Sequence, residues 1–210
     1  MCSWTRNSST TFITQEILVD LITLEEYKTY KGVKTTDDDG RILQIIAHVS
    51  ALVKHFCNRS FIDYYSTDKV EYHDSRFSTL YLRELPLISI TTVEYSTDGG
   101  QTYEVLVDGE NYIIDQYNDT ITTGSTAVPF ASEGLTTNGM KVTYKGGFLD
   151  CPEDLKICSF DIVDYYRSEQ YIPKKVMSGA TSDNEVFRLM RSERFPIHIQ
   201  RVLNLYRIVV

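Results

Sequence analysis

Several patterns that identify catalytic or cofactor-binding proteins are missing from this sequence. It has no phosphate-binding G-x-x-x-x-G-K-[ST] loop, no dinucleotide-binding G-x-G-x-x-G loop and no G-x-S-x-G nucleophile elbow. His48 and His55 fall on one predicted helix about 10 Å apart, which is too far for them to share a metal ion. His73 and His198 are isolated in the sequence. We therefore expect no catalytic residue, no bound metal and no cofactor.

Paired cysteines and long apolar runs are also missing. The cysteines form no C-x-x-C pair, which argues against a zinc module or a disulfide scaffold and favours reduced thiols. They are Cys2, Cys57, Cys151 and Cys158. No apolar run approaches the roughly 20 residues of a membrane helix, and residues 1–12 lack the apolar core of a secretion signal. We expect no membrane contact and folding in the cytoplasm of the producing cell.

Positive charge is scarce overall and unevenly placed. The chain has 21 Lys and Arg against 29 Asp and Glu, whereas a protein that grips nucleic acid over its whole surface needs the opposite excess. Residues 1–172 carry 14 basic and 26 acidic side chains, and residues 173–210 carry 7 and 3. A basic tail on an acidic body indicates two surfaces with different partners. The alternative is a solvated helical end that happens to be basic.

The 210 residues are enough for one domain with a sizeable core, and the pattern along them is helical at both ends. Thr23 and Glu26 have the spacing of a capping box, so a short helix should run to about Tyr30 and end at Gly32. Acidic residues at 37–39 should open a second helix that ends near Asn58. Its apolar stripe consists of Ile42, Ile45, Ile46, Val49, Leu52, Val53 and Phe56.

Residues 61–148 change to short Tyr-, Val-, Ile- and Thr-rich segments between turn signals, which is a strand pattern. The predicted strands are 69–73, 78–82, 88–95, 103–107, 112–115, 120–122 and 140–145. Helix returns with Pro152 at its first position and continues until Pro173 stops it. A capping box at Ser182 predicts a short helix to about Arg194, and Pro196 begins the last helix. The fold class is therefore α+β, with four to five helices and a long antiparallel β insert between the second and third.

One hairpin signal resembles the Asp-box of sialidases and related propellers. Ser96 and Asp98 can brace the backbone of a turn, while Gly99 and Gly100 supply its strained dihedral angles. A propeller shows the motif once per blade, but here it occurs once. We interpret these four residues as a structural hairpin turn. A carbohydrate-binding or carbohydrate-active module, suggested by this motif and by the 15 tyrosines, is the alternative from another class.

Taken in order, the motifs resemble those of the head–tail connector (adaptor) proteins of tailed double-stranded-DNA bacteriophages. The resemblance covers about residues 21–171. Its motifs are LITLEEYK at 21–28, DDDGRIL at 37–43 leading to CNRSF at 57–61, LRELPLISITTV at 82–93, a Gly-rich hairpin followed by ENY at 110–112, and YKGGF at 144–148 before PEDLK at 152–156. The arm before Leu21 and the segment 173–210 have no counterpart that we can match.

The resemblance implies a structural virion protein at the head–tail interface. Such a protein forms a ring of probably twelve copies below the portal, extends the DNA channel and contacts the portal and a tail or stopper protein. A tail-completion or stopper subunit is the alternative within this class. The implied parts are an N-terminal arm (1–20), an adaptor domain (21–172) and a basic C-terminal segment (173–210).

The candidate portal-binding residues are the basic residues of the C-terminal segment, because Arg and Lys pair with interface carboxylates. They are Lys174, Lys175, Arg188, Arg191, Arg194, Arg201 and Arg207. The acidic body should line the channel at least in part, so that DNA passes without adhering and without sequence-specific binding.

Overall fold

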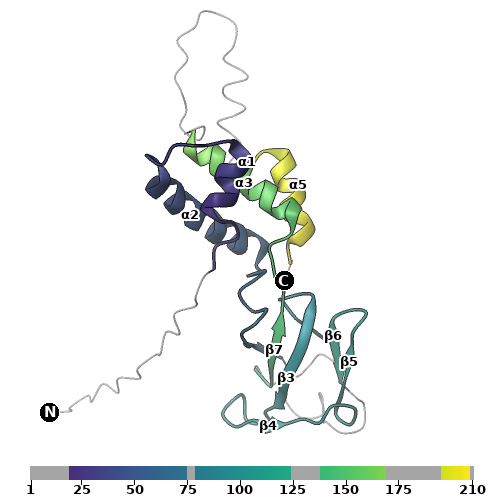
Figure 1. The fold of residues 1–210 in the computed structure, drawn as a ribbon. Coiled ribbons are helices and arrows are strands. Elements are labelled where there is room, and N and C mark those ends of the chain that lie inside the picture. Colours follow the sequence, from purple (N-terminus) through teal and green to yellow (C-terminus); the bar gives the residue numbers. More distant parts are fainter. Residues whose placement is uncertain (1–18, 75–78, 124–137, 169–194, 209–210) are drawn as a thin grey trace, which may run out of the picture.

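The computed structural model describes residues 19–74, 79–123, 138–168 and 195–208. Figure 1 shows the helices gathered at one end and the strands at the other. The helices are α1 (Leu24–Lys31), α2 (Asp39–Cys57), α3 (Glu153–Arg167) and α5 (Ile197–Tyr206). The strands are β1 (Lys69–His73), β2 (Thr79–Tyr81), β3 (Leu87–Tyr95), β4 (Glu104–Val105), β5 (Tyr112–Asp115), β6 (Thr120–Thr123) and β7 (Met140–Gly146). The predicted α+β fold, with its antiparallel insert between the second and third helices, is confirmed.

Some predicted features lie outside the described residues. They are most of the arm at 1–20, Cys2, the loop at 174–181 and the helix from Ser182 to Arg194. In the described part of the chain, no helix is long and apolar enough to cross a membrane.

Helix α1 begins and ends where the local sequence predicts. The Thr23 hydroxyl accepts a hydrogen bond from the Glu26 N–H at 3.2 Å, and the Glu26 carboxylate accepts one from the Thr23 N–H at 2.8 Å, which completes the capping box. Gly32 ends the helix at φ +66°, in the left-handed region that favours glycine.

Helix α2 buries a wider face than the apolar stripe predicts. Ile42, Ile46, Val49 and Val53 are buried as expected, and Asn58 ends the helix in the left-handed conformation. The helix begins at Asp39. Asp38 is the N-cap residue, and its side chain makes no capping hydrogen bond. Three further positions on the helix are also buried, namely Ser50, Lys54 and Cys57.

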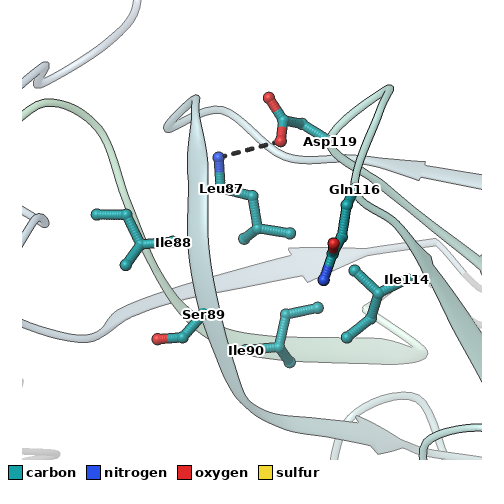
Figure 2. Close-up of a pocket in the computed structure, with 7 residues that line it drawn as sticks. All are labelled: Leu87, Ile88, Ser89, Ile90, Ile114, Gln116 and Asp119. Atoms are coloured by element: carbon teal, nitrogen blue, oxygen red, sulfur yellow. Dashed lines mark hydrogen bonds between the residues drawn. The ribbon is translucent and has the colours of Figure 1, made fainter.

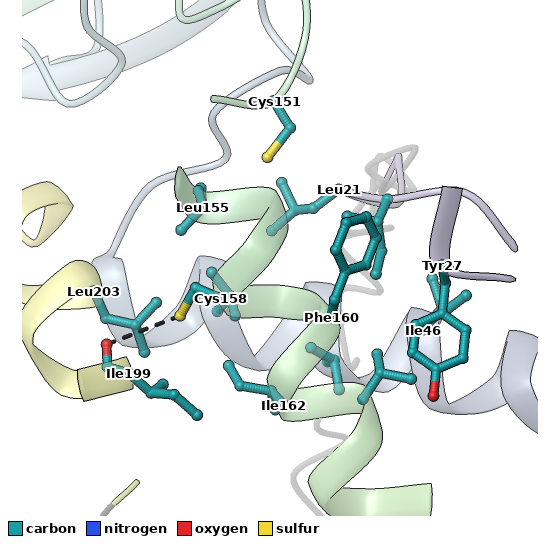
Figure 3. Close-up of a cluster of buried hydrophobic side chains, with 14 of the residues drawn as sticks. Leu21, Tyr27, Ile46, Cys151, Leu155, Cys158, Phe160, Ile162, Ile199 and Leu203 are labelled. Atoms are coloured by element: carbon teal, nitrogen blue, oxygen red, sulfur yellow. Dashed lines mark hydrogen bonds between the residues drawn. The ribbon is translucent and has the colours of Figure 1, made fainter. Parts of the chain in front are cut away.

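Helices α3 and α5 close the helical core against α1 and α2 (Figure 3). Leu155, Cys158 and Ile162 of α3 meet Ile199 and Leu203 of α5, and all five side chains are buried. The contact joins segments separated by about 40 residues in the sequence.

Both boundaries of α3 differ from the prediction. Pro152 is the N-cap and not the first helical residue, since its ψ of 140° is extended. The helix ends at Arg167, and Ser168 is its C-cap, whose N–H and hydroxyl both donate to the Asp164 carbonyl at 2.9 and 2.6 Å. The backbone bond has the spacing of the helix itself, and the hydroxyl adds a second donor to the same terminal carbonyl.

The strands form two antiparallel sheets that face each other. The larger sheet has the order β1-β7-β3-β4 and the smaller β2-β6-β5. A second hydrophobic core lies between them and includes Leu80 and Ile121 from the small sheet and Val93 and Val142 from the large one. Strand β4 is shorter than predicted because the Val107 N–H donates to the Asn111 side chain and the chain turns there.

Candidate functional site

The Asp-box-like segment forms the turn between β3 and β4. One Asp98 oxygen accepts hydrogen bonds from the Ser96 hydroxyl and from the N–H groups of Gln101 and Thr102, while the other accepts one from the Thr102 hydroxyl at 2.6 Å. These hydrogen bonds lower the pKa of Asp98, and the Thr102 hydroxyl makes the largest contribution. Both carboxylate oxygens of Asp98 therefore serve the turn itself.

The two glycines complete this turn. Gly99 and Gly100 have φ values of +76° and +88°, which other residues rarely adopt, and the Gly100 N–H donates to the Ser96 hydroxyl at 2.8 Å. Ser96, Asp98, Gly99 and Gly100 therefore lie in a hairpin turn, as interpreted from the sequence. The turn accounts for their contacts without a role in sugar binding.

The cysteines described by the structure are free and buried. Burial raises the pKa of the Cys57 thiol to about 11 and those of Cys151 and Cys158 to about 12. Such thiols stay protonated and act as small hydrophobic groups in the helical core. Within the described ranges, no group of three or more His, Cys, Asp or Glu could hold a metal ion.

Two of the seven candidate portal-binding residues lie in the described part of the chain. Arg201 is exposed on α5, and the Arg207 guanidinium lies 5.3 Å from the centre of the Phe56 ring. Lys174, Lys175, Arg188, Arg191 and Arg194 lie outside the described residues.

A buried polar junction, which the sequence reading did not anticipate, connects the helical core to the sheets. Its centre is Glu84, which is 1% exposed. The Glu84 carboxylate accepts hydrogen bonds from the N–H groups of Ser60 at 2.9 Å and Phe61 at 3.2 Å, just after α2. The ammonium group of Lys69 in β1 lies 2.7 Å from the same carboxylate. A buried charge that is paired in this way fixes two segments that are distant in sequence.

Tyr144 extends this junction into the large sheet. Its hydroxyl donates to Glu71 at 2.8 Å and accepts from the Glu84 N–H at 3.0 Å. Burial alone would raise the pKa of Glu71, but the nearby His73 side chain, the charge of Lys69 and the hydrogen bond from Tyr144 together lower it. Burial and the nearby carboxylates raise the pKa of Tyr144, so that its phenol remains a donor.

Two glycines allow the backbones to meet at the same place. A Cβ at Gly146 would lie 2.2 Å from the Glu84 carbonyl oxygen, and one at Gly147 would lie 2.2 Å from that of Phe61. Gly147 also has a φ of +104°. The close approach allows the Phe148 N–H to donate to the Phe61 carbonyl at 2.7 Å. The YKGGF segment is therefore the point where strand β7 passes to the helical core.

A second buried polar contact secures the start of the described chain on α2. The ammonium group of Lys54, 6% exposed, lies 2.6 Å from Asp63 and donates to the Val19 carbonyl, also at 2.6 Å. The Leu21 N–H donates to the Ser50 hydroxyl at 3.0 Å. The polar positions buried on α2 thus hold the segment that precedes α1.

Two surface hollows accompany this framework. One, of about 360 Å³, lies between the start of β3 and the β5–β6 turn, where the Leu87 N–H donates to Asp119 (Figure 2). The other, of about 530 Å³, lies between α1 and α3 and is lined by Tyr30, Phe160 and the Glu26–Lys156 ion pair. Neither contains the constellation of nucleophile, base and orienting group that catalysis requires.

The order of motifs along this fold resembles that of head–tail connectors of phage-like particles, and a family model agrees with this class. The model of the head completion protein family matches residues 20–209. This match covers most of the chain, so the chain belongs to the head completion protein family. No curated protein matches it.

Solved particle structures contain chains with a similar fold. A neck chain of the empty gene transfer agent (GTA) particle, determined with C6 symmetry, is 14% identical, with a TM-score of 0.52 over 90% of this chain and 91% of that one. A neck chain of the native GTA particle with C12 symmetry is 14% identical, with a TM-score of 0.52 over 92% and 96%. A chain of the native GTA virion is 15% identical, with a TM-score of 0.53 over 90% and 91%. At these identities the likeness concerns the fold.

Proposed function

We propose that this chain is a non-enzymatic adaptor that forms a twelve-membered ring below the portal of a phage-like virion and extends the DNA channel towards the tail. The observation that carries the proposal is the family match over residues 20–209. The similar fold of a neck chain from a particle with C12 symmetry supports the number of copies. A ring of this kind uses heterologous contacts that close on themselves.

In an adaptor, the acidic body and the basic end of this chain would have different functions. Residues 1–172 carry a large excess of carboxylates, and a channel wall of that charge repels DNA phosphates. Residues 173–210 carry the seven basic side chains proposed above to pair with carboxylates of the portal. Arg201, which is exposed on α5, is the described member of this set with the freest access to a partner.

A cryo-electron-microscopy reconstruction of particles that carry this chain tests the ring. We expect twelve copies between the portal and the next tail-side ring. A position beyond a separate adaptor ring would identify the chain as a stopper or tail-completion subunit, and a copy number that does not match a neck ring would reject the proposal.

Charge reversal tests the proposed portal contact. Particles assembled with the triple variant Arg188→Glu, Arg191→Glu and Arg194→Glu should recruit less of this chain to portal-containing heads. The matched control reverses three exposed cations elsewhere, with Lys34→Glu, Arg41→Glu and Arg83→Glu. Equal recruitment of the triple variant and wild type, both folded, would rule out this contact.

A further inference from the structure

The outer face of the large sheet carries several exposed apolar side chains. The register aligns Tyr72, Lys141, Glu94 and Val105 across β1, β7, β3 and β4. The row beside it runs through Glu71, Val142 and Val93, and the two valines are fully buried. Because side chains alternate along a strand, the first row must face outward. Tyr72 is 54% exposed and Val105 64% exposed.

Side chains of this outward row contact one another and their neighbour Tyr103. The Tyr103 ring lies 6.3 Å from the Tyr72 ring and 5.4 Å from the Lys141 ammonium group, which pairs with Glu94 at 2.5 Å. Val70, 45% exposed, adds to the apolar area on the same face of β1. Contiguous apolar area with tyrosines is typical of a protein–protein contact. We call these residues of β1, β7, β3 and β4, with Tyr103, the large-sheet face.

The small sheet presents a second face of the same kind. Leu80, Ile121 and Ile114 are aligned by register and point into the core between the sheets. The neighbouring residues Tyr81 and Ile113 therefore point outward, and they are 74% and 60% exposed. These outward residues of β2, β6 and β5 form the small-sheet face.

The two faces lie on opposite sides of one sandwich, because the inner surfaces of both sheets share a single core. Contacts between opposite faces of identical subunits are heterologous, and such contacts generate rings or filaments, whereas a face that pairs with itself generates a closed dimer. Opposite apolar faces are thus the geometry that a cyclic assembly needs.

Charge also favours contact between unlike faces. Residues 106–123, which contain β5 and β6, include four acidic side chains and no Lys or Arg. The outward positions of β7 instead include Lys141 and Lys145. Packing the large-sheet face on the small-sheet side places these lysines near those carboxylates.

We propose that the large-sheet face of one copy of this chain binds the small-sheet face of the next copy. This inference rests on the proposed ring and names the surfaces that build it. The contact is a property of the chain itself, so it forms in the isolated protein at high concentration.

Cross-linking between the two faces tests the inference. All variants carry Cys2→Ser, and the remaining cysteines are buried. The double variant Val105→Cys with Ile113→Cys, treated with a short bis-maleimide at high protein concentration, should give a ladder of covalent oligomers. Each single variant should stay monomeric, because the head-to-tail contact never brings two copies of one face together. The matched control places both cysteines on the helical part, with Leu149→Cys and Ile157→Cys, at positions that are also exposed.

The outcomes separate this inference from the ring itself. Efficient dimers from either single variant would mean that a face pairs with itself, which overturns the inference. Oligomers seen by light scattering without a ladder would place the contact elsewhere and leave the ring proposal standing. Isolated protein that stays monomeric and unlinked at every concentration would also overturn the inference, while a reconstruction of particles without a ring of this chain would overturn the proposed function.

Discussion

Alanine at four glycines provides a direct test of how the helical core and the sheets are joined. Gly147 combines a φ of +104° with a Cβ position 2.2 Å from a backbone oxygen, whereas Gly146 has the same close approach without a positive φ. Gly32 has a φ of +66° with no atom near its Cβ position, and Gly40 has neither constraint. The four sites separate backbone strain from steric contact.

The expected losses in the free energy of unfolding follow from these two terms. A left-handed conformation costs a residue with a Cβ about 1–2 kcal/mol, and overpacking against a rigid group costs about 1–3 kcal/mol. We therefore expect Gly32→Ala to cost about 1 kcal/mol and Gly146→Ala about 2 kcal/mol. Gly147→Ala should cost about 3 kcal/mol or more, while Gly40→Ala, in a helix, should be neutral or stabilise by up to about 1 kcal/mol.

Urea unfolding followed by far-ultraviolet circular dichroism measures these differences at constant m-value. The control is internal, since Gly32 and Gly40 lie away from the junction. The reasoning fails if Gly147→Ala is no more destabilising than Gly32→Ala. That result would mean that the Phe61 carbonyl group can move away from the added methyl group without a loss of stability.

Three further outcomes are expected. Leu203→Ala should cost about 2–5 kcal/mol in urea unfolding, because the side chain is fully buried between α5 and the helical core, and a loss under 1 kcal/mol would contradict that packing. Glu71→Gln should flatten the acid limb of the stability–pH curve. The pKa of Glu71 is lowered from 4.5 on folding, so its stabilising contribution is present above about pH 4.5 and is lost as the pH falls through the folded pKa. An unchanged acid limb would refute the assignment. In a Cys2→Ser background, a thiol reagent should label the native protein at neutral pH far more slowly than the protein in urea, since burial raises the pKa of Cys57, Cys151 and Cys158, and fast native labelling would show that these thiols are accessible.

The helices could be predicted because their signals are local. Thr23 and Glu26 are three residues apart and cap α1 through their own side chains. The inward face of α5 follows from the helical spacing of Ile199 and Leu203. The end of α3 at Arg167 is not marked in the sequence, because Pro173 is the first proline or glycine after it.

The junction could not be predicted because its partners are far apart in the chain. Tyr144 and Glu71 are separated by 73 positions, and the Glu84 carboxylate reaches back 23 positions to the Phe61 N–H. A buried Glu is ordinarily unfavourable, so composition alone places Glu84 at the surface. Only the tertiary fold brings Lys69 and two backbone N–H groups to it.

Three of the motifs that carry the family resemblance meet at this junction. CNRSF supplies the N–H groups of Ser60 and Phe61, LRELPL supplies Glu84, and YKGGF supplies Tyr144 with its two glycines. These three motifs therefore encode how the sheets attach to the helices. This explains why the sequence identified the family while the ring and portal contacts require experiment: the geometry of the junction limits which residues can stand there, whereas an outward strand position such as Tyr72 or Ile113 tolerates many residues in the isolated chain.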